Sequence, residues 1–125
     1  MVTWTDDELR RIGGADELRV TSERPDGSLR PFTTIWHSTL GGELYIRSAH
    51  GPENGWFRRA RQAGVGRISS GGVEKDVTFE LADAGVREAL DAALHQKYDR
   101  YGAGPVGAIT GDDVLETTLK VTPRG

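Results

Sequence analysis

The residues with the most evident chemistry are two arginines on either side of a turn in the first quarter of the chain. Arg24 and Arg30 flank Pro25-Asp26-Gly27-Ser28, a sequence typical of a tight turn. Guanidinium groups bind phosphate through paired N–H donors, a serine hydroxyl adds another donor, and turn amides can form an anion-binding concavity. The alternative is a plain hairpin loop with solvated charges, which the phosphate-repelling carboxylate of Asp26 favours.

Hydroxyl and aromatic side chains on two neighbouring predicted strands form a second constellation. Thr34 and Trp36 on one strand and Ser48 on the next lie within reach of one another if they share a face. Small hydroxyls would let a flat ring approach the backbone, with Trp36 as a wall, whereas the alternative is ordinary core packing of a strand tryptophan. His50, in the loop that leaves the second strand, is the histidine placed to contact a ligand.

A third constellation is the arginine-rich stretch Gly55-Trp56-Phe57-Arg58-Arg59-Ala60-Arg61. Its spacing predicts an amphipathic helix that buries Trp56, and a helix that begins after a glycine turn offers its N-terminus to anions. Arg59 lies one turn from Trp56, which makes it the arginine of interest. The alternative is a solvated charged face.

Composition excludes several classes of function. The net charge of −3 gives no general attraction to nucleic acid, although residues 19–67 hold eight arginines against four carboxylates. The absence of cysteine excludes disulfides and thiolate metal sites, and no His/Asp/Glu spacing resembles a metal site. His37 and His95 are predicted on the surfaces of a strand and a helix. No nucleophile elbow, phosphate-binding loop or dinucleotide fingerprint is present. The polar, acidic start and the lack of a long apolar run predict a cytoplasmic protein without a membrane partner.

The elements that position these residues follow from local patterns. Thr5 to Glu8 form a capping box ahead of a short helix that Gly13-Gly14 end in a left-handed conformation. Further helices are predicted over residues 53–63, with Gly64 as the stop, and after Asp83. Strands are predicted over residues 17–24, 32–40, 43–48, 65–69, 73–81 and 115–122. Hairpins at Gly41-Gly42 and Gly71-Gly72 favour a small antiparallel β-barrel with helices at its rim, an α+β domain spanning residues 1–125.

Taken in order, these segments resemble the split-β-barrel group of flavin- and deazaflavin-binding proteins, an FMN-binding split-barrel-like fold. The most similar members are the deazaflavin-dependent nitroreductase-like proteins and an allied family of small uncharacterised actinobacterial proteins. The likeness to that family covers nearly the whole chain; the likeness to the nitroreductases covers about residues 24–80, with weaker support from residues 97–101. The matching segments are Arg24, Gly27-Ser28-Leu29-Arg30-Pro31, Thr34-Ile35-Trp36, Gly42-Glu43-Leu44-Tyr45-Ile46-Arg47-Ser48, Gly51 and Trp56.

The resemblance implies a barrel whose loops hold the cofactor phosphate and whose strands flank the ring. Tyr98 and Tyr101 match a tyrosine pair near the substrate pocket of such relatives. Two departures are Asp26 in the phosphate turn and Arg59, where relatives often carry asparagine. The cofactor-binding residues predicted from residues and resemblance together are Arg24, Ser28, Arg30, Thr34, Trp36, Ser48, His50, Gly51, Trp56, Arg59 and Arg67.

The function that this resemblance implies is a flavin- or deazaflavin-dependent oxidoreductase for a small conjugated or aromatic substrate, with a deazaflavin coenzyme or FMN as cofactor. The alternative is a cofactor-free or non-catalytic barrel that binds a small anionic or aromatic ligand. No catalytic residue is assigned, although Tyr98, Tyr101 or His50 would be able to donate a proton. Split barrels commonly pair, so by analogy a homodimer is expected.

Overall fold

Seven antiparallel strands form one sheet in the order β2-β1-β5-β6-β7-β4-β3. The structure is a computed structural model that describes residues 3–48, 54–102, 106–107, 109–110 and 117–124. The strands are β1 (Leu18–Ser22), β2 (Thr33–Ile35), β3 (His37–Leu40), β4 (Glu43–Arg47), β5 (Val65–Ser70), β6 (Val73–Leu81) and β7 (Thr118–Pro123).

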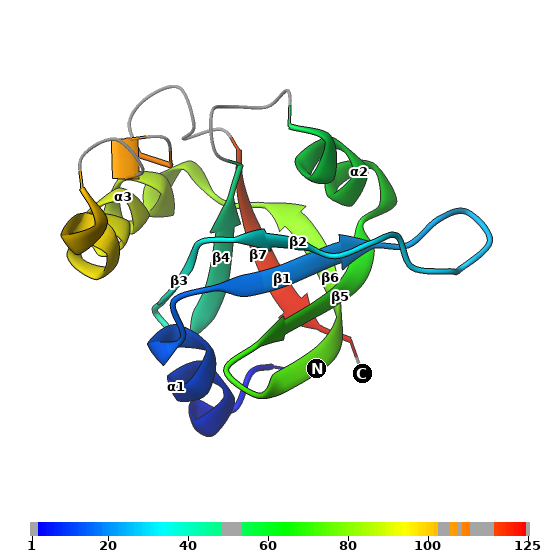
Figure 1. The fold of residues 1–125 in the computed structure, drawn as a ribbon, viewed down its shortest axis with the longest axis horizontal. Coiled ribbons are helices and arrows are strands. Elements are labelled where there is room, and N and C mark those ends of the chain that lie inside the picture. The colour runs from blue at the N-terminus through cyan, green and yellow to red at the C-terminus, as the bar shows by residue number, and fades with distance from the viewer. Residues whose placement is uncertain (1–2, 49–53, 103–105, 108, 111–116, 125) are drawn as a thin grey trace.

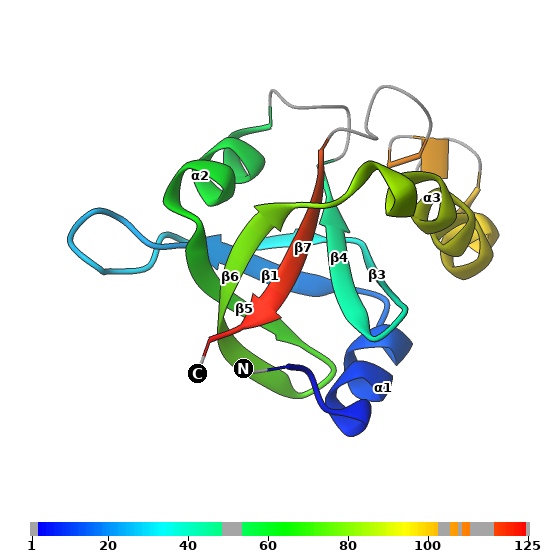
Figure 2. The same ribbon diagram turned by 180° about the vertical axis from the view of Figure 1, so that it is seen from behind.

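The sheet closes on itself because its two edge strands follow each other along the chain. β2 pairs only with β1 and β3 only with β4, yet a single residue, Trp36, separates β2 from β3. The result is a nearly closed antiparallel barrel (Figures 1 and 2), which confirms the predicted fold class. The prediction of one strand over residues 32–40 was wrong in one respect, because Trp36 divides it into two strands: β2 pairs with β1, and β3 pairs with β4. The place where these two edge strands meet at Trp36 is here called the seam.

Both predicted glycine hairpins are confirmed. Gly41 and Gly42 have φ of 60° and 83°, and Gly71 and Gly72 have φ of 57° and 84°. Two successive residues with positive φ give the tight turn whose twist matches that of the flanking strands. These turns set the registers Leu40↔Glu43 and Ser70↔Val73.

Three α-helices lie at the ends of the barrel: α1 (Asp6–Gly14), α2 (Gly55–Ala63) and α3 (Ala84–Tyr98), the last continued by a short 3₁₀ turn, Asp99–Tyr101. The capping box is confirmed, since Glu8 N donates to Thr5 Oγ1 at 3.1 Å and Thr5 N donates to Glu8 Oε1 at 2.9 Å. Gly64 ends α2 at φ 72° as predicted. The left-handed end predicted for α1 was wrong, because Gly13 and Gly14 stay helical and Ala15 is extended. None of the described helices has both the length and the apolar character needed to span a bilayer.

The core has two parts because β4 is buried on both faces. Inside the barrel, Leu44 and Ile46 pack with residues such as Leu18, Ile68 and Leu119. Tyr45, which alternates to the outer face, packs with Leu90, Leu94 and Tyr98 of α3. This second cluster fastens α3 to the outside of the barrel.

Residues 23–32, here called the arm, join β1 to β2 and project beyond the barrel beside α2 (Figures 1 and 2). Arg24 N donates to Ser28 O at 2.8 Å, and Arg30 N donates to Ser22 O at 3.1 Å. The arm is therefore an irregular hairpin with Pro25-Asp26-Gly27-Ser28 at its tip, as the turn sequence predicts.

The base of the arm depends on close backbone contact with β5 at Gly66. A Cβ at that position would lie 2.0 Å from Thr21 O and 2.8 Å from the Phe79 ring. We expect Gly66→Ala to lower the free energy of unfolding by about 2 kcal/mol or more, as overpacking does. Gly14→Ala, with nothing within 4 Å of its Cβ, is the control and should be neutral or slightly stabilising. Urea unfolding of both variants measures this, and equal stabilities would contradict it.

Candidate functional site

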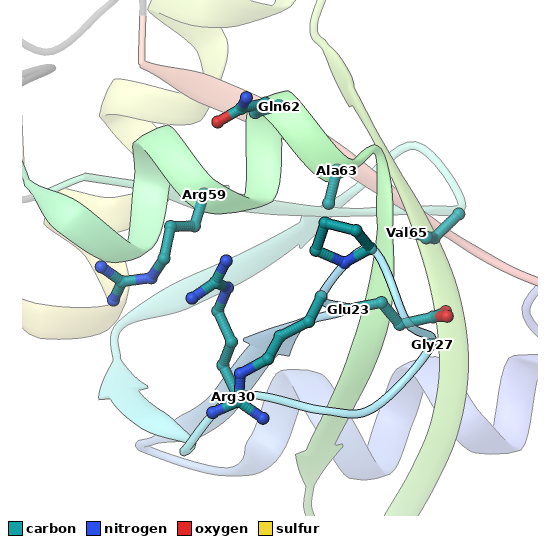
Figure 3. A pocket seen from close by; sticks show the side chains of 9 residues that line it. Glu23, Gly27, Arg30, Arg59, Gln62, Ala63 and Val65 are labelled. Carbon is teal, nitrogen blue, oxygen red and sulfur yellow. The ribbon is translucent and has the colours of Figure 1, made fainter.

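A cavity of about 470 Å³, here called the basic pocket, opens between the arm and α2. Arg24 and Arg30 come from the arm and Arg59 from α2, and the Arg30 side chain extends toward α2 while that of Arg59 runs along α2 toward Gly55 (Figure 3). The structure thus brings together three of the predicted cofactor-binding arginines from two separate segments. The full lining is Glu23, Arg24, Pro25, Gly27, Arg30, Arg59, Gln62, Ala63 and Val65.

The basic pocket is lined by three arginines and one carboxylate. Among the described residues, no carboxylate lies within ion-pair distance of Arg30 or Arg59. Arg24 Nη1 is held within the arm, donating to Leu29 O at 2.9 Å. The lining carboxylate, Glu23, accepts from Arg124 Nη1 at 2.5 Å, so its charge is already matched.

The carboxylate of Asp26 is bound within the tip of the arm. Its Oδ1 accepts from Ser28 N at 2.9 Å and from Ser28 Oγ at 2.6 Å, and these hydrogen bonds hold the pKa of the Asp26 carboxyl below its usual value. Neither residue is part of the pocket lining. The Ser28 hydroxyl donates to Asp26 and shapes the turn, so Ser28 lies outside the basic pocket and its role as a phosphate ligand stays a prediction.

A second cavity of about 300 Å³, here called the aromatic pocket, lies at the seam of the barrel. Trp36 forms one wall and is itself stacked on Tyr98, with ring centroids 4.1 Å apart and planes 5° apart. Trp56 comes from the first turn of α2. The full lining is Glu17, Thr33, Thr34, Ile35, Trp36, Arg47, Asn54, Trp56 and Ile109, which includes the predicted residues Thr34, Trp36 and Trp56.

A third, small cavity of about 10 Å³ shares lining residues with both pockets. Arg30 and Arg59 line the basic pocket and the small cavity, and Thr33 and Trp56 line the small cavity and the aromatic pocket. The three cavities therefore adjoin one another, and together they are here called the groove, with a cationic end and an aromatic end. Arg59 lies against Gly55, since a Cβ there would be 2.8 Å from Arg59 Nη1. A glycine at the start of α2 thus makes room for the guanidinium.

Arg47 is the pocket residue that the sequence did not single out. Its guanidinium is almost fully buried and donates to Thr118 Oγ1 at 2.8 Å, to Asp91 Oδ1 at 2.6 Å and to Ile109 O at 3.1 Å. Burial lowers the pKa of Arg47, against the opposing effect of Asp91. These contacts tie β4 to β7 and α3 beneath the aromatic pocket. Arg47 and Tyr45 lie two residues apart and therefore on the same outer face of β4. This pattern indicates a buried arginine only once α3 is known to pack against that face.

Several predicted site residues lie elsewhere. Ser48 is fully buried, with its N–H donated to Thr117 Oγ1 at 3.2 Å, and it lines neither pocket. Arg67 donates to Asp76 Oδ1 and Glu74 Oε2, both at 3.0 Å, on the outer face of β5. These ion pairs raise the pKa of Arg67 and match its charge outside the groove. His50 and Gly51 lie outside the described residues.

The tyrosine pair supports the groove from behind. Tyr98 is fully buried; its hydroxyl accepts from His37 N at 3.2 Å and lies 2.9 Å from Asp16 O. Burial raises the pKa of Tyr98 to about 12. Tyr101 is exposed and donates to Asp16 Oδ2 at 2.6 Å. Neither lines the described pockets, so the predicted direct role of Tyr98 in a substrate pocket is not what the geometry favours; it backs Trp36 instead.

His37 is buried, so its prediction as a surface residue was wrong. Its exposure is 0%, and Nε2 lies 2.6 Å from Ile12 O. Burial, and then the nearby Lys97 ammonium, lower the pKa of His37 to about 4. His95 is exposed, as predicted. In the described part of the chain, no cluster of three or more His, Asp or Glu is placed to hold a metal ion.

Comparison with known proteins identifies a family and a fold. The family model described as "Uncharacterized protein conserved in bacteria (DUF2255)" matches residues 8–121. It describes bacteria at large, so the restriction to actinobacteria stays a prediction. No curated protein matches the chain in sequence.

Solved structures share the fold at low sequence identity. A putative pyridoxamine 5'-phosphate oxidase from Listeria innocua has a TM-score of 0.64 and 16% identity, over 96% of this chain and 93% of that one. An F420 reductase has a TM-score of 0.58 and 14% identity, over 98% and 97%. An FAD-binding protein from Mesorhizobium loti has a TM-score of 0.56 and 14% identity, over 98% and 91%. The resemblance to the split-barrel group is thereby confirmed for the fold.

The buried His37 predicts a pH dependence of stability. Because the pKa of His37 is about 4 in the folded protein against an ordinary 6.5, the unfolded chain takes up a proton first as the pH falls. Stability is then lost from about pH 6.5 downward, by about 2 kcal/mol between pH 7 and pH 5. Urea unfolding across this range measures the loss. His37→Gln, whose amide can still donate to Ile12 O, should make the free energy of unfolding less dependent on pH in this range. An unchanged pH dependence in that variant would show that other groups cause it.

Proposed function

The chain belongs to the family of uncharacterised bacterial proteins whose model it matches over residues 8–121, and we propose that it is a flavin- or deazaflavin-dependent oxidoreductase for a small conjugated or aromatic substrate. Structural neighbours of the same barrel fold include an F420 reductase and an FAD-binding protein. Because their sequence identity to this chain is low, these neighbours support the fold and not a function. The proposal therefore depends on the groove of this chain.

The observation that carries the proposal is that the two pockets adjoin each other. Arg30 and Arg59 line the basic pocket and the small cavity, and Trp56 lines the small cavity and the aromatic pocket. A ligand with an anionic group at one end and a planar ring at the other fits this order of charge and aromatic surface. Pockets of roughly 300–1,000 Å³ with a few convergent polar groups are typical small-molecule sites, and both pockets reach that size.

Each end of the groove has a distinct task. Arg30 and Arg59, with no carboxylate partner in the described chain, would supply charge-assisted hydrogen bonds to the anionic group. Trp36 is fixed by its stack on Tyr98 and presents a rigid wall for the ring, which together with Trp56 excludes water. A bound flavin or deazaflavin would supply the hydride chemistry, while the protein binds and orients it. Ser48, His50 and Gly51 stay predicted cofactor neighbours, whereas Arg67 lies outside both pockets and has no part in the proposed site.

A non-catalytic barrel that binds an anionic aromatic ligand is the second candidate. The state of Tyr98 favours it, because the hydroxyl predicted as a proton donor is buried and bonded to backbone atoms. The same groove would then hold a ligand without turnover. A homodimer and a cytoplasmic location remain predictions.

Titration with FMN, a deazaflavin coenzyme and haem tests the site. We expect FMN or deazaflavin to bind at micromolar concentration and to quench tryptophan fluorescence, because Trp36 and Trp56 line the aromatic pocket. Quenching should fall in Trp36→Phe and Trp56→Phe. It should persist in Trp4→Phe, since Trp4 is buried with its indole N–H on Val121 O at 2.8 Å. Saturable binding of neither flavin nor deazaflavin would refute the cofactor, and binding without reduction of any substrate would favour the second candidate.

Replacement of single arginines tests the basic end. Arg30→Gln and Arg59→Gln should each weaken cofactor binding by about 2 kcal/mol, roughly 30-fold, because each removes a charged donor to the anionic group. Arg67→Gln is the matched control, as Arg67 is paired with Asp76 and Glu74 outside both pockets. Calorimetric titration gives the three dissociation constants. Equal values for Arg59→Gln and Arg67→Gln would remove Arg59 from the site.

A further inference from the structure

The three lysines of the chain, Lys75, Lys97 and Lys120, are all half-buried but differ in their partners. Lys75 Nζ lies 2.5 Å from Glu8 Oε2, and Lys120 Nζ lies 3.0 Å from Glu80 Oε1. Within the described ranges, no carboxylate lies within 4.0 Å of Lys97. Lys97 is therefore the lysine whose charge is not matched by an ion pair.

The contacts of the Lys97 ammonium are weak partners for a positive charge. Its Nζ donates to His37 O at 3.1 Å and lies 5.0 Å from the centre of the Tyr98 ring. It is also 3.3 Å from His37 Nε2, but that nitrogen lies 2.6 Å from Ile12 O and so directs its own hydrogen to a carbonyl. The described contacts that stabilise the charge are consequently one carbonyl and one ring face.

Charged groups farther from Lys97 do not replace the missing ion pair. Asp16, between α1 and β1, attracts the ammonium, but its carboxylate already accepts from Arg100 Nη2 at 2.5 Å and from the Tyr101 hydroxyl at 2.6 Å. Burial lowers the pKa of Lys97 to about 8; Asp16 opposes this effect, and the positive charge of Arg100 adds to it. Near neutral pH, a larger share of Lys97 is therefore the neutral amine than in an ordinary lysine. The neutral amine is the nucleophilic form.

We propose that Lys97 is a site of acylation, at which a small activated acyl compound such as an acyl phosphate reacts with the side-chain amine. The amine nitrogen forms a bond to the carbonyl carbon, and the bond from that carbon to the phosphate oxygen breaks. The phosphate leaves with the proton that the amine loses, so the step needs no oxidant, reductant or further reactant. The proposal goes beyond the cofactor site and does not depend on it.

The surroundings of Lys97 favour an acyl donor over other electrophiles. An amide is neutral, whereas the Schiff base that an aldehyde forms takes up a proton, and the carbamate that carbon dioxide forms is an anion. Burial that disfavours the ammonium disfavours both of these charged products as well. The amide keeps one N–H, so the hydrogen bond to His37 O can be retained. Because Lys97 lies against Tyr98, which stacks on Trp36, the acyl group would be attached one ring behind the aromatic pocket.

Reaction of the full chain with acetyl phosphate, the probe, tests the proposal. At intervals the protein is unfolded and its remaining amines are acetylated with a deuterated reagent, so that mass spectrometry gives the reacted fraction of each lysine. At about pH 7.5 we expect Lys97 to react about tenfold faster than Lys75 or Lys120, whose amines are ion-paired. The rate at Lys97 should rise with pH and level off at about pH 9, one unit above its pKa. That of Lys120 should still be rising there, because Glu80 raises the pKa of Lys120.

Arg100→Gln tests whether the surroundings of Lys97 cause its reactivity. The substitution removes a cation that lowers the pKa of Lys97 and frees Asp16 to attract the ammonium. Acetylation at Lys97 should therefore slow about threefold. Arg124→Gln is the matched control, because it also removes an exposed arginine from an ion pair, that with Glu23. It should leave the rate at Lys97 unchanged.

The outcomes decide the proposal without reference to a cofactor. A rate at Lys97 no higher than the rates at Lys75 and Lys120 would overturn it. An equal response of Lys97 to the two arginine variants would overturn it as well. Because FMN and deazaflavin take no part in the reaction, failure of the cofactor titration leaves this site standing, and failure of selective acetylation leaves the groove standing.

Discussion

The barrel depends on how Tyr98 holds its seam. β2 and β3 are the two edges of the sheet, and the chain passes from one to the other through Trp36. The ring of Tyr98 stacks on Trp36, while its hydroxyl contacts the backbone of His37 and Asp16. One buried side chain from α3 thus fixes the bend at which the sheet closes. Without it, Trp36 would lose its support and the aromatic pocket one wall.

The walls of the basic pocket are set by a second constraint, at the junction of α2 and β5. Gly64 ends α2, and the next residue, Val65, accepts a hydrogen bond from Glu23 N at 3.1 Å, at the root of the arm. The arm is therefore anchored to Val65, the first residue of β5, which follows α2 directly after Gly64. The spacing between Arg30 and Arg59 follows from this junction, because the two elements cannot separate there without breaking the ladder between β1 and β5.

Local signals in the sequence predicted the helices, strands and turns well. The burial and the partners of individual side chains depended on tertiary contacts, which the sequence does not show. The two hairpin glycine pairs, the capping box and Gly64 act through the residues beside them, so their outcomes were visible in the chain, whereas Gly13-Gly14 stay helical. The same kind of reasoning placed Arg24, Arg30 and Arg59 as candidates, and the structure gathers them at one pocket. It misjudged His37, because a histidine in a short polar strand looks exposed until α1 and α3 are known to cover it. Arg47 escaped notice for the same reason: its partners Asp91, Ile109 and Thr118 are distant in sequence.

The sequence left two interpretations of the arm open, an anion site and a plain solvated loop. The direction of one carboxylate, that of Asp26, decides between them. Asp26 would weaken an anion site if it faced the pocket, but the Ser28 amide and hydroxyl hold it in the tip of the turn. The positive charge of Arg30 and Arg59 then has no partner among the described carboxylates. The backbones that carry these two arginines are an α-helix and a hydrogen-bonded hairpin, so little backbone reorganisation is needed when an anion binds. This arrangement favours the interpretation of the arm as part of an anion site over that of a solvated loop, whichever ring the aromatic pocket accepts.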